Sequence, residues 1–178
     1  MNENKIWYKV VASDFDNLPI GEVYGTETNV KGRKIAFSAS ELKEIKPKAG
    51  FKLVCKITSV GESECKAELE SLSHSREHLS KMIRYNVSKL DIVVPVELGG
   101  KSYVVKVVCL ISKAENKYKK AVQAEVREFL KEETKKTTLK ELILDSLTGK
   151  VQNQIHKKLN KIYPTRMIEI RDISPYKK

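Results

Sequence analysis

The sequence predicts an α+β protein: a curled antiparallel sheet or β-barrel-like sheet in the first two-thirds, then helices and a final strand. Residues 1–113 contain short segments in which apolar and polar residues alternate, as they do in strands. Beyond them the apolar residues recur at helical spacing, until alternation returns near the end. The chain has 178 residues, 40% of them apolar, which is enough for a core. We therefore expect residues 1–178 to form a single domain, with a β-rich part (1–113) and a helical part with a closing strand (114–178).

Strand patterns fill the first part of the chain. Segments rich in β-branched and aromatic residues alternate with groups of turn-forming residues. The predicted strands are Ile6–Ala12, Gly21–Thr28, 34–38, Phe51–Val60 and Cys65–Leu72. Gly61 and its polar neighbours join the last two strands as a hairpin. Ser38 and Glu41 have the spacing of a capping box, which predicts a short helix from about Ala39 to Ile45.

A short helix and a second hairpin are expected in the middle of the chain. Ser75 has the side chain of an N-cap and precedes apolar residues at helical spacing. Gly99 and Gly100 separate two apolar segments, Leu90–Leu98 and Lys101–Ser112. Because a two-residue hairpin turn requires positive φ at its centre, two glycines between strand patterns predict a hairpin.

Three helices and one strand are expected after residue 113. The first helix, Asn116–Lys136, is long and amphipathic. Its predicted inward-facing residues are Ala121, Val122, Val126, Phe129 and Leu130. Thr138 begins a second capping box, and the helix that follows ends at Gly149. A third helix ends at Pro164, and Met167–Ile173 alternates as the closing strand.

Positive charge is the most informative feature for function. Thirty-four Lys and Arg residues stand against 23 Asp and Glu, a net charge of +11. Residues 31–60, 76–120 and 150–178 each carry a net charge of +6, and acidic segments separate them. Clustered positive charge attracts polyanions because binding releases condensed counterions. Nucleic acid is therefore the class of partner that we expect.

Basic residues in turns and at helix starts are the candidate RNA contacts. Lys31, Arg33 and Lys34 surround Gly32, and a glycine lets backbone amides approach a phosphate. The residues expected to bind RNA are Lys31, Arg33, Lys34, Arg76, Lys81, Arg84, Lys89, Lys117, Lys119, Lys120, Arg127 and Lys131. Adjacent aromatic residues in a strand usually point to opposite faces. One of Trp7 and Tyr8 is therefore expected in the core, and the other is free to stack on a base.

Motifs of catalysis and cofactor binding are missing from the sequence. Neither a P-loop nor a dinucleotide-binding glycine motif is present, so we expect no cofactor and no small-molecule substrate. Three widely spaced cysteines predict buried thiols, not a disulfide framework or a zinc ribbon. His74 and His78 lie four residues apart, and we expect an exposed pair without a metal. Two alternatives remain: an RNA-processing factor that uses these histidines, and a protein-interaction adaptor with a basic surface.

No segment predicts membrane insertion or export. The first residues have no apolar stretch of the kind found in signal peptides. The longest apolar stretch, Val104–Ile111, is interrupted by Lys106 and is far shorter than a bilayer span. We therefore expect a cytoplasmic protein without a membrane partner.

Several short motifs, in order, resemble one known family. They are Lys5-Ile6-Trp7-Tyr8, Ile20-Gly21-Glu22, Val30-Lys31-Gly32-Arg33, Phe37-Ser38, Phe51-Lys52-Leu53, Ser75-Arg76-Glu77-His78, the Gly99-Gly100 hairpin, Tyr118 through Arg127, Ile162-Tyr163-Pro164 and Ile168-Glu169-Ile170-Arg171. Their order and spacing resemble the archaeal and eukaryotic S-three-Ae family of small-subunit ribosomal proteins, also called eukaryotic-type small-subunit protein one. The resemblance covers nearly the whole chain.

The resemblance implies a structural role in translation and no enzymatic activity. Members of that family lie on the platform of the small ribosomal subunit, near the messenger-RNA exit, and bind the 3′ region of the small-subunit rRNA. The implied partners are this rRNA, neighbouring platform proteins and messenger RNA near its exit. The implied location is the ribosome in the cytoplasm.

Overall fold

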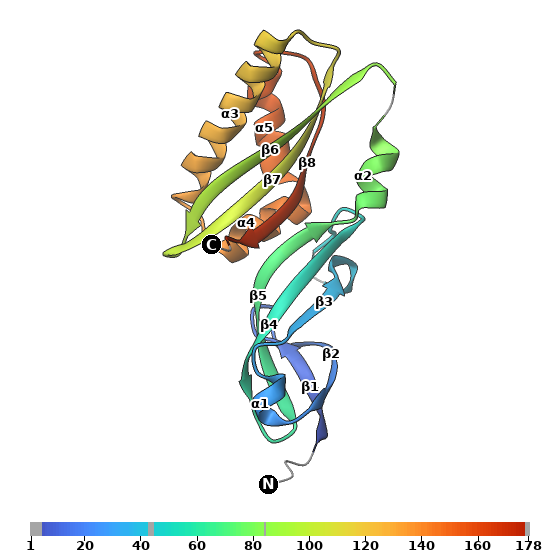
Figure 1. Ribbon diagram of the computed structural model, residues 1–178, viewed down its shortest axis with the longest axis vertical. Helices are drawn as coiled ribbons and strands as arrows, with labels where there is room; N and C mark the ends of the chain where they lie inside the picture. The colour runs from blue at the N-terminus through green and yellow to red at the C-terminus, as the bar shows by residue number, and fades with distance from the viewer. Residues whose placement is uncertain (1–4, 43–44, 84, 177–178) are drawn as a thin grey trace.

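The computed structural model describes residues 5–42, 45–83 and 85–176 (Figure 1). The elements are β1 (Ile6–Ala12), β2 (Leu18–Gly25), α1 (Glu27–Val30), β3 (Lys34–Ser38), the 3-10 helix η1 (Ala39–Glu41), β4 (Phe51–Val60), β5 (Glu64–His74), α2 (Arg76–Met82), β6 (Val87–Leu98), β7 (Lys101–Ser112), α3 (Asn116–Thr134), α4 (Leu139–Thr148), α5 (Lys150–Leu159) and β8 (Thr165–Pro175). This order confirms the α+β prediction, with the longer helices in the second half of the chain. No helix among these residues is both long and apolar enough to span a bilayer.

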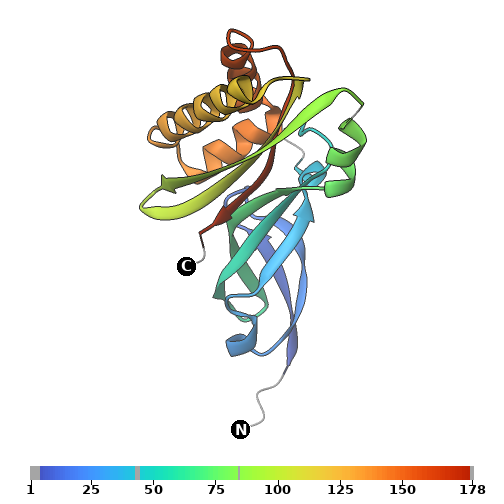
Figure 2. The same ribbon diagram turned by 45° about the horizontal axis from the view of Figure 1, so that its top comes forward.

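The molecule is elongated, with strands at both ends and the three longest helices at one of them. Strands β1 to β5 form a curled sheet at the N-terminal end, and α3, α4 and α5 cover one face of β6, β7 and β8 (Figures 1 and 2). The sheet order is β2-β1-β5-β8-β7-β6, with β4 on the other edge of β5 and β3 beside β4. All strands of the described residues therefore belong to one eight-stranded sheet.

Strand β5 connects the two ends because two different strands share one of its edges. Along that edge, Glu64–Ala67 pair in parallel with β1, and Leu72 and Ser73 then pair antiparallel with β8. The opposite edge pairs with β4. The sheet is thus open and mixed: it is curled and largely antiparallel, as expected, but it contains the parallel pair of β1 with β5. A parallel pair requires a long connection, and the chain between β1 and β5 supplies it with β2, β3 and β4.

Several predicted boundaries shift for local reasons. The second strand begins and ends earlier than predicted, because residues after Gly25 form the short helix α1, whose Val30 is completely buried. The predicted helix from Ala39 is a single 3-10 turn that ends at Glu41, although its capping box forms as expected. Residues 43–44 of that predicted helix lie outside the described residues. Ser75 occupies the N-cap position of α2 but its side chain makes no capping hydrogen bond.

One contiguous hydrophobic core runs through both ends of the molecule. Helix α3 contributes Val122, Val126, Phe129 and Leu130 to it, as the helical spacing predicted. Ala121, also predicted to face inward, is exposed, because it lies just outside the stripe that contacts the sheet. Helix α2 packs on β7 through a small separate cluster of Leu79, Val108 and Leu110. The helices and sheet therefore hold the surface residues on a common scaffold.

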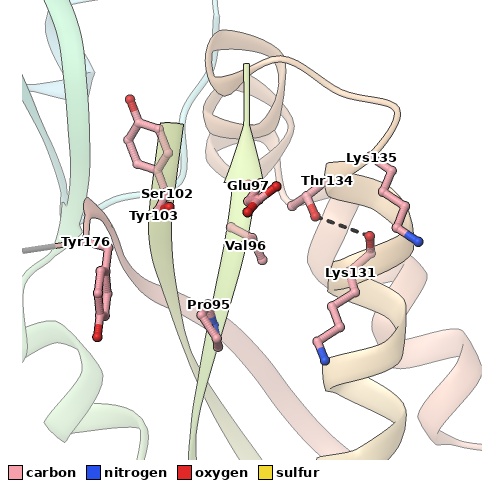
Figure 3. Close-up of a pocket in the computed structure, with 9 residues that line it drawn as sticks. All are labelled: Pro95, Val96, Glu97, Ser102, Tyr103, Lys131, Thr134, Lys135 and Tyr176. Atoms are coloured by element: carbon pink, nitrogen blue, oxygen red, sulfur yellow. Dashed lines mark hydrogen bonds between the residues drawn. The ribbon is translucent and has the colours of Figure 1, made fainter. Parts of the chain in front are cut away.

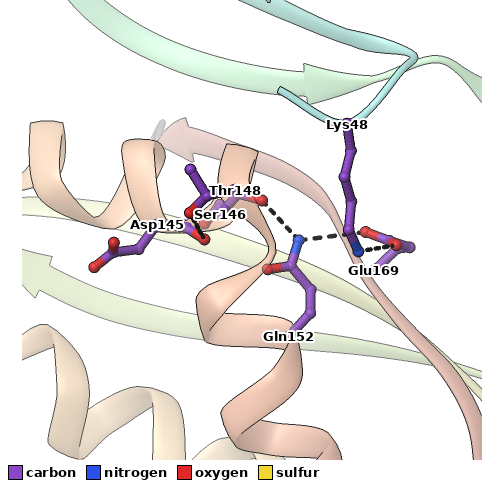
Figure 4. Close-up of polar contacts among 6 residues, drawn as sticks. All are labelled: Lys48, Asp145, Ser146, Thr148, Gln152 and Glu169. Carbon is purple, nitrogen blue, oxygen red and sulfur yellow. Dashed lines mark hydrogen bonds and ion pairs between the residues drawn. The ribbon is translucent and has the colours of Figure 1, made fainter. Parts of the chain in front are cut away.

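An ion pair between an exposed lysine and a buried glutamate links the two ends. Lys48 precedes β4, and its Nζ lies 2.8 Å from Oε1 of Glu169 on β8 (Figure 4). The Lys48 backbone N–H donates to the carbonyl of Leu147, at 3.0 Å. Glu169 is only 5% exposed, and Nε2 of Gln152 donates to its other carboxylate oxygen at 3.3 Å. A buried carboxylate needs such partners, because without them its desolvation is uncompensated.

We predict that Lys48→Ala lowers the free energy of unfolding by about 2 kcal/mol, because Glu169 loses its cation while it stays buried. Urea denaturation followed by circular dichroism measures the loss. The double variant K48A/E169Q should lose less than the sum of the two single variants, since a neutral amide needs no cation.

The matched control is Lys150→Ala, which breaks the exposed ion pair between Lys150 and Asp145. It should change the free energy of unfolding by no more than about 0.5 kcal/mol. Equal losses from K48A and K150A would contradict a stabilising role for the contact between Lys48 and Glu169.

Candidate nucleic-acid interface

The first basic surface is the turn after α1. Gly32 has φ of +85°, which favours glycine, and lies between exposed Lys31 and Arg33. The Gly32 N–H donates to the carbonyl of Ile57 at 2.9 Å, and the Ile57 N–H donates to the carbonyl of Arg33 at 2.9 Å. These bonds fix the turn on β4. The Arg33 guanidinium also donates to the carbonyl of Tyr24 at 3.2 Å.

A groove of about 520 Å³ runs beside this turn, and the fold adds two bases to it. Lys31 lines the groove together with Lys56 of β4 and Lys101 of β7. Glu70 also lines it and forms an ion pair with Lys34, so part of the predicted charge of Lys34 is neutralised. Sequence reasoning missed Lys56 and Lys101, because only the tertiary fold brings strands β4 and β7 to the turn.

The second basic surface is a small pocket where α2 meets the sheet. Arg76 of α2, Lys89 of β6 and Arg171 of β8 line a pocket of about 160 Å³ with an apolar floor that includes Val108. Asp91 lies 2.9 Å from Lys89 and 3.8 Å from Arg171, so one carboxylate offsets part of three positive charges. Two arginines and a lysine that converge from three elements suit a phosphate group.

Among the predicted residues near this pocket, the outcomes differ. Arg76 and Lys89 are brought together as expected, whereas Lys81 lies in the last turn of α2 and does not line the pocket. Arg84 lies outside the described residues. Arg171 was missed, because its place in an alternating strand gave no indication that β8 runs beside α2.

The third basic surface is the end of the molecule at which α3 begins. Lys117, Lys119 and Lys120 lie in the first turns of this helix. Between them, Tyr118 contacts Tyr163 with ring centroids 4.9 Å apart, so the start of α3 lies against the connection from α5 to β8. An aromatic residue among lysines is a common arrangement in RNA-binding surfaces.

Two further predicted residues lie apart from these surfaces, along α3. Arg127 is exposed on the helix, and Lys131 lies farther along it with Lys135 beside a groove of about 450 Å³ (Figure 3). Tyr176, after β8, also lines this groove. The predicted residues are therefore spread over several places on one scaffold and do not form a single continuous patch.

Most of the predicted basic residues have their charge available for an external anion. Within the part of the chain that the structure describes, Lys34 pairs with Glu70 and Lys89 pairs with Asp91. The other predicted residues there have no ion pair with a described carboxylate: Lys31, Arg33, Arg76, Lys81, Lys117, Lys119, Lys120, Arg127 and Lys131. Binding a phosphate at these positions breaks no internal ion pair.

The two histidines do not form the exposed pair that was expected. His74 is 6% exposed, because β5 extends to it and strand alternation turns its ring inward against Phe51, with ring centroids 4.3 Å apart. The ring of half-buried His78 lies 5.2 Å from that of His74. Among the described residues, no three His, Cys, Asp or Glu side chains are grouped to hold a metal ion. The cysteines are buried free thiols, as predicted, and burial raises the pKa of Cys109 to about 12.

Comparison with known proteins assigns the chain to a family. The sequence profile of the ribosomal S3Ae family matches residues 2–178. The chain belongs to the ribosomal S3Ae family. This match confirms the resemblance that the short motifs indicated.

Relatives in archaea cover most of this chain. The small ribosomal subunit protein eS1 of Methanoculleus marisnigri is 28% identical over 170 residues, which are 93% of this chain and 86% of the relative. The protein of the same name from Archaeoglobus fulgidus is 26% identical over 175 residues, 95% of this chain and 83% of the relative. That of Haloarcula marismortui is 28% identical over 174 residues, with coverage of 95% and 81%. The similarity thus extends over both ends of the S3Ae fold.

We predict that acid destabilises the protein in part through His74. Burial lowers the pKa of His74, although the Ser75 carbonyl and Glu169 act in the opposite direction. The unfolded chain takes up a proton below about pH 6.5 that the folded His74 resists, so stability falls as the pH falls. Urea midpoints measured from about pH 7.5 to about pH 5.5 should fall more steeply for the wild type than for His74→Gln. Parallel curves for the two proteins would contradict this assignment.

Proposed function

We propose that this chain is a structural component of the small ribosomal subunit that binds small-subunit rRNA on the platform near the messenger-RNA exit. Membership of the S3Ae family is the observation that carries the proposal. The relatives bear the name of a small ribosomal subunit protein. The proposed partners are rRNA and neighbouring platform proteins, with messenger RNA close to its exit, and the proposed location is the ribosome in the cytoplasm. In this role the chain catalyses no reaction.

The basic surfaces support a mechanism based on charge and shape. Each cation that neutralises a phosphate releases condensed counterions, and this term is independent of base sequence. Arginine adds geometry, because its guanidinium binds a phosphate through two parallel hydrogen bonds. In the pocket of Arg76, Lys89 and Arg171, Asp91 neutralises only part of the positive charge, and a bound phosphate would neutralise the rest. A folded RNA that presents phosphates at matching places is selected by its shape.

Besides positive charge, this mechanism requires a rigid scaffold. We propose that residues 1–178 act as one domain, supported by the shared core and the pairing of β5 with β8. A rigid protein loses little conformational entropy on binding, so more of the interaction energy appears as affinity. The separate basic surfaces then act together, because binding at one surface positions the others.

We predict that the triple variant R76Q/K89Q/R171Q weakens binding to a transcript of the 3′ region of small-subunit rRNA. Removal of three phosphate contacts should lower the magnitude of the slope of log affinity against log salt by about three. Filter binding over a series of salt concentrations measures both affinity and slope.

The control variant K46Q/K52Q/K66Q removes the same charge from three exposed lysines outside the basic surfaces. It should leave the slope closer to that of the wild type. Equal slopes for the two triple variants would show that net charge alone governs binding. Wild-type affinity that does not change with salt would contradict the proposed function.

A further inference from the structure

An exposed pair of aromatic rings lies on the N-terminal sheet and lines none of the grooves described above. Trp7, the only tryptophan of the chain, lies directly opposite Tyr24 on the neighbouring strand β2. Their ring centroids are 5.2 Å apart and the rings are tilted by 45°. Trp7 is 65% exposed and Tyr24 is 49% exposed, whereas Tyr8 is only 5% exposed. The two adjacent aromatic residues of β1 therefore point to opposite faces, as the sequence predicted.

Neither ring of this pair belongs to the hydrophobic core. A tryptophan usually contributes to stability by burying its large apolar surface, and most of the surface of Trp7 remains in water. The two rings contact each other, so together they present an open aromatic surface. Aromatic residues that are exposed in this way serve recognition more often than folding.

The surroundings of the pair are charged, with residues of both signs. Residues two apart on a strand share a face, which places Lys9 on the same face as Trp7. Lys9 lies between two acidic residues of the neighbouring strands, Glu22 of β2 and Glu64 of β5. The hydrogen bond from the Arg33 guanidinium to the Tyr24 carbonyl brings the first basic surface next to the pair. Lys9 and Arg33 are thus the cations next to the two rings.

We propose that Trp7 and Tyr24 form a stacking site for an unpaired base of single-stranded RNA, with Lys9 and Arg33 next to the flanking phosphates. This inference rests on the proposed function, which makes RNA the partner. An unpaired base offers a flat face to an aromatic ring and a phosphate on each side to a cation. Bases within a duplex are already stacked on each other and do not fit. A protein partner would require a broader apolar surface than two rings with charged neighbours.

The fluorescence of Trp7 tests the proposal directly, because no other tryptophan contributes to the emission. Single-stranded oligoadenylate of about twelve nucleotides is compared with an RNA duplex that carries the same number of phosphates. Binding of each RNA is followed independently by the anisotropy of a fluorescein label. We expect the single strand to quench Trp7 emission to saturation, and the duplex to bind without quenching.

Variants separate stacking from charge. Trp7→Leu should weaken single-strand binding about tenfold or more, since loss of a stacked base has an effect of this size, and should leave duplex binding unchanged. Trp7→Phe keeps an aromatic ring and should retain most of the affinity. Tyr24→Leu should weaken single-strand binding as well. Tyr85→Leu is the matched control, because Tyr85 is 91% exposed but has no place in this pair, and it should have no effect.

The results that would contradict the stacking site can be distinguished from those that would contradict the proposed function. If single-stranded RNA raises the anisotropy but does not quench Trp7, or if W7L binds as tightly as the wild type, the stacking site is wrong and the proposed function stands. If neither RNA binds at low salt, the proposed function fails, and the stacking site fails with it. If W7L removes binding to a neighbouring ribosomal protein and leaves RNA binding intact, the surface recognises protein and the proposal is overturned.

Discussion

The sharing of one edge of β5 between β1 and β8 determines the shape of the molecule. Backbone pairing there is specific, because a shift by one residue would turn every side chain to the opposite face. The pairing of Leu72 with Ile173 brings the last strand of the chain beside the N-terminal sheet. The ion pair of Lys48 with Glu169 also links the segment before β4 to β8. Two of the basic surfaces depend on this arrangement, because each combines residues from elements that the pairing of β5 with β8 brings together: Lys31 and Lys56 with Lys101, and Arg76 with Lys89 and Arg171.

The basic residues fall into two groups: a few form ion pairs within the fold, and most lie on the surface. Folding uses a few cations internally, such as Lys48 and Lys106, whose partner is Asp172 at 2.8 Å. An exposed cation contributes little to folding stability, so selection for folding alone does not require clusters of them. The clusters at Gly32, at α2 and at the start of α3 remain on the surface, where Glu70 and Asp91 offset only part of their charge. A polyanionic partner gives these residues a role that the isolated fold does not.

Local features were predictable from the sequence, and contacts between distant segments were not. The bounds of β1 and β4 agree with the alternation of residues, and Thr138 caps α4 as its spacing with Glu141 indicated. These depend on neighbours along the chain. The parallel pairing of β1 with β5 depends on tertiary packing and leaves no mark in local sequence.

The candidate site shows the same division between local and distant contacts. Lys31 and Arg33 were predictable because both flank the glycine of one turn. Lys101 joins them only through the fold, and Arg171 meets Arg76 in the same way. Burial of His74 was missed because the predicted strand ended at Leu72, two residues too early. For Lys101 and Arg171 the missing information was which elements lie side by side, and for His74 it was where β5 ends.

Co-sedimentation of the full chain with purified small ribosomal subunits over a series of salt concentrations would test whether clustered positive charge holds the protein on the subunit. We expect the protein to stay with the small subunit through moderate salt and to be released only at high salt, because many phosphate contacts act together. Failure to co-sediment at any salt concentration would contradict a place in the small subunit. Retention that does not depend on salt would contradict binding through clustered positive charge.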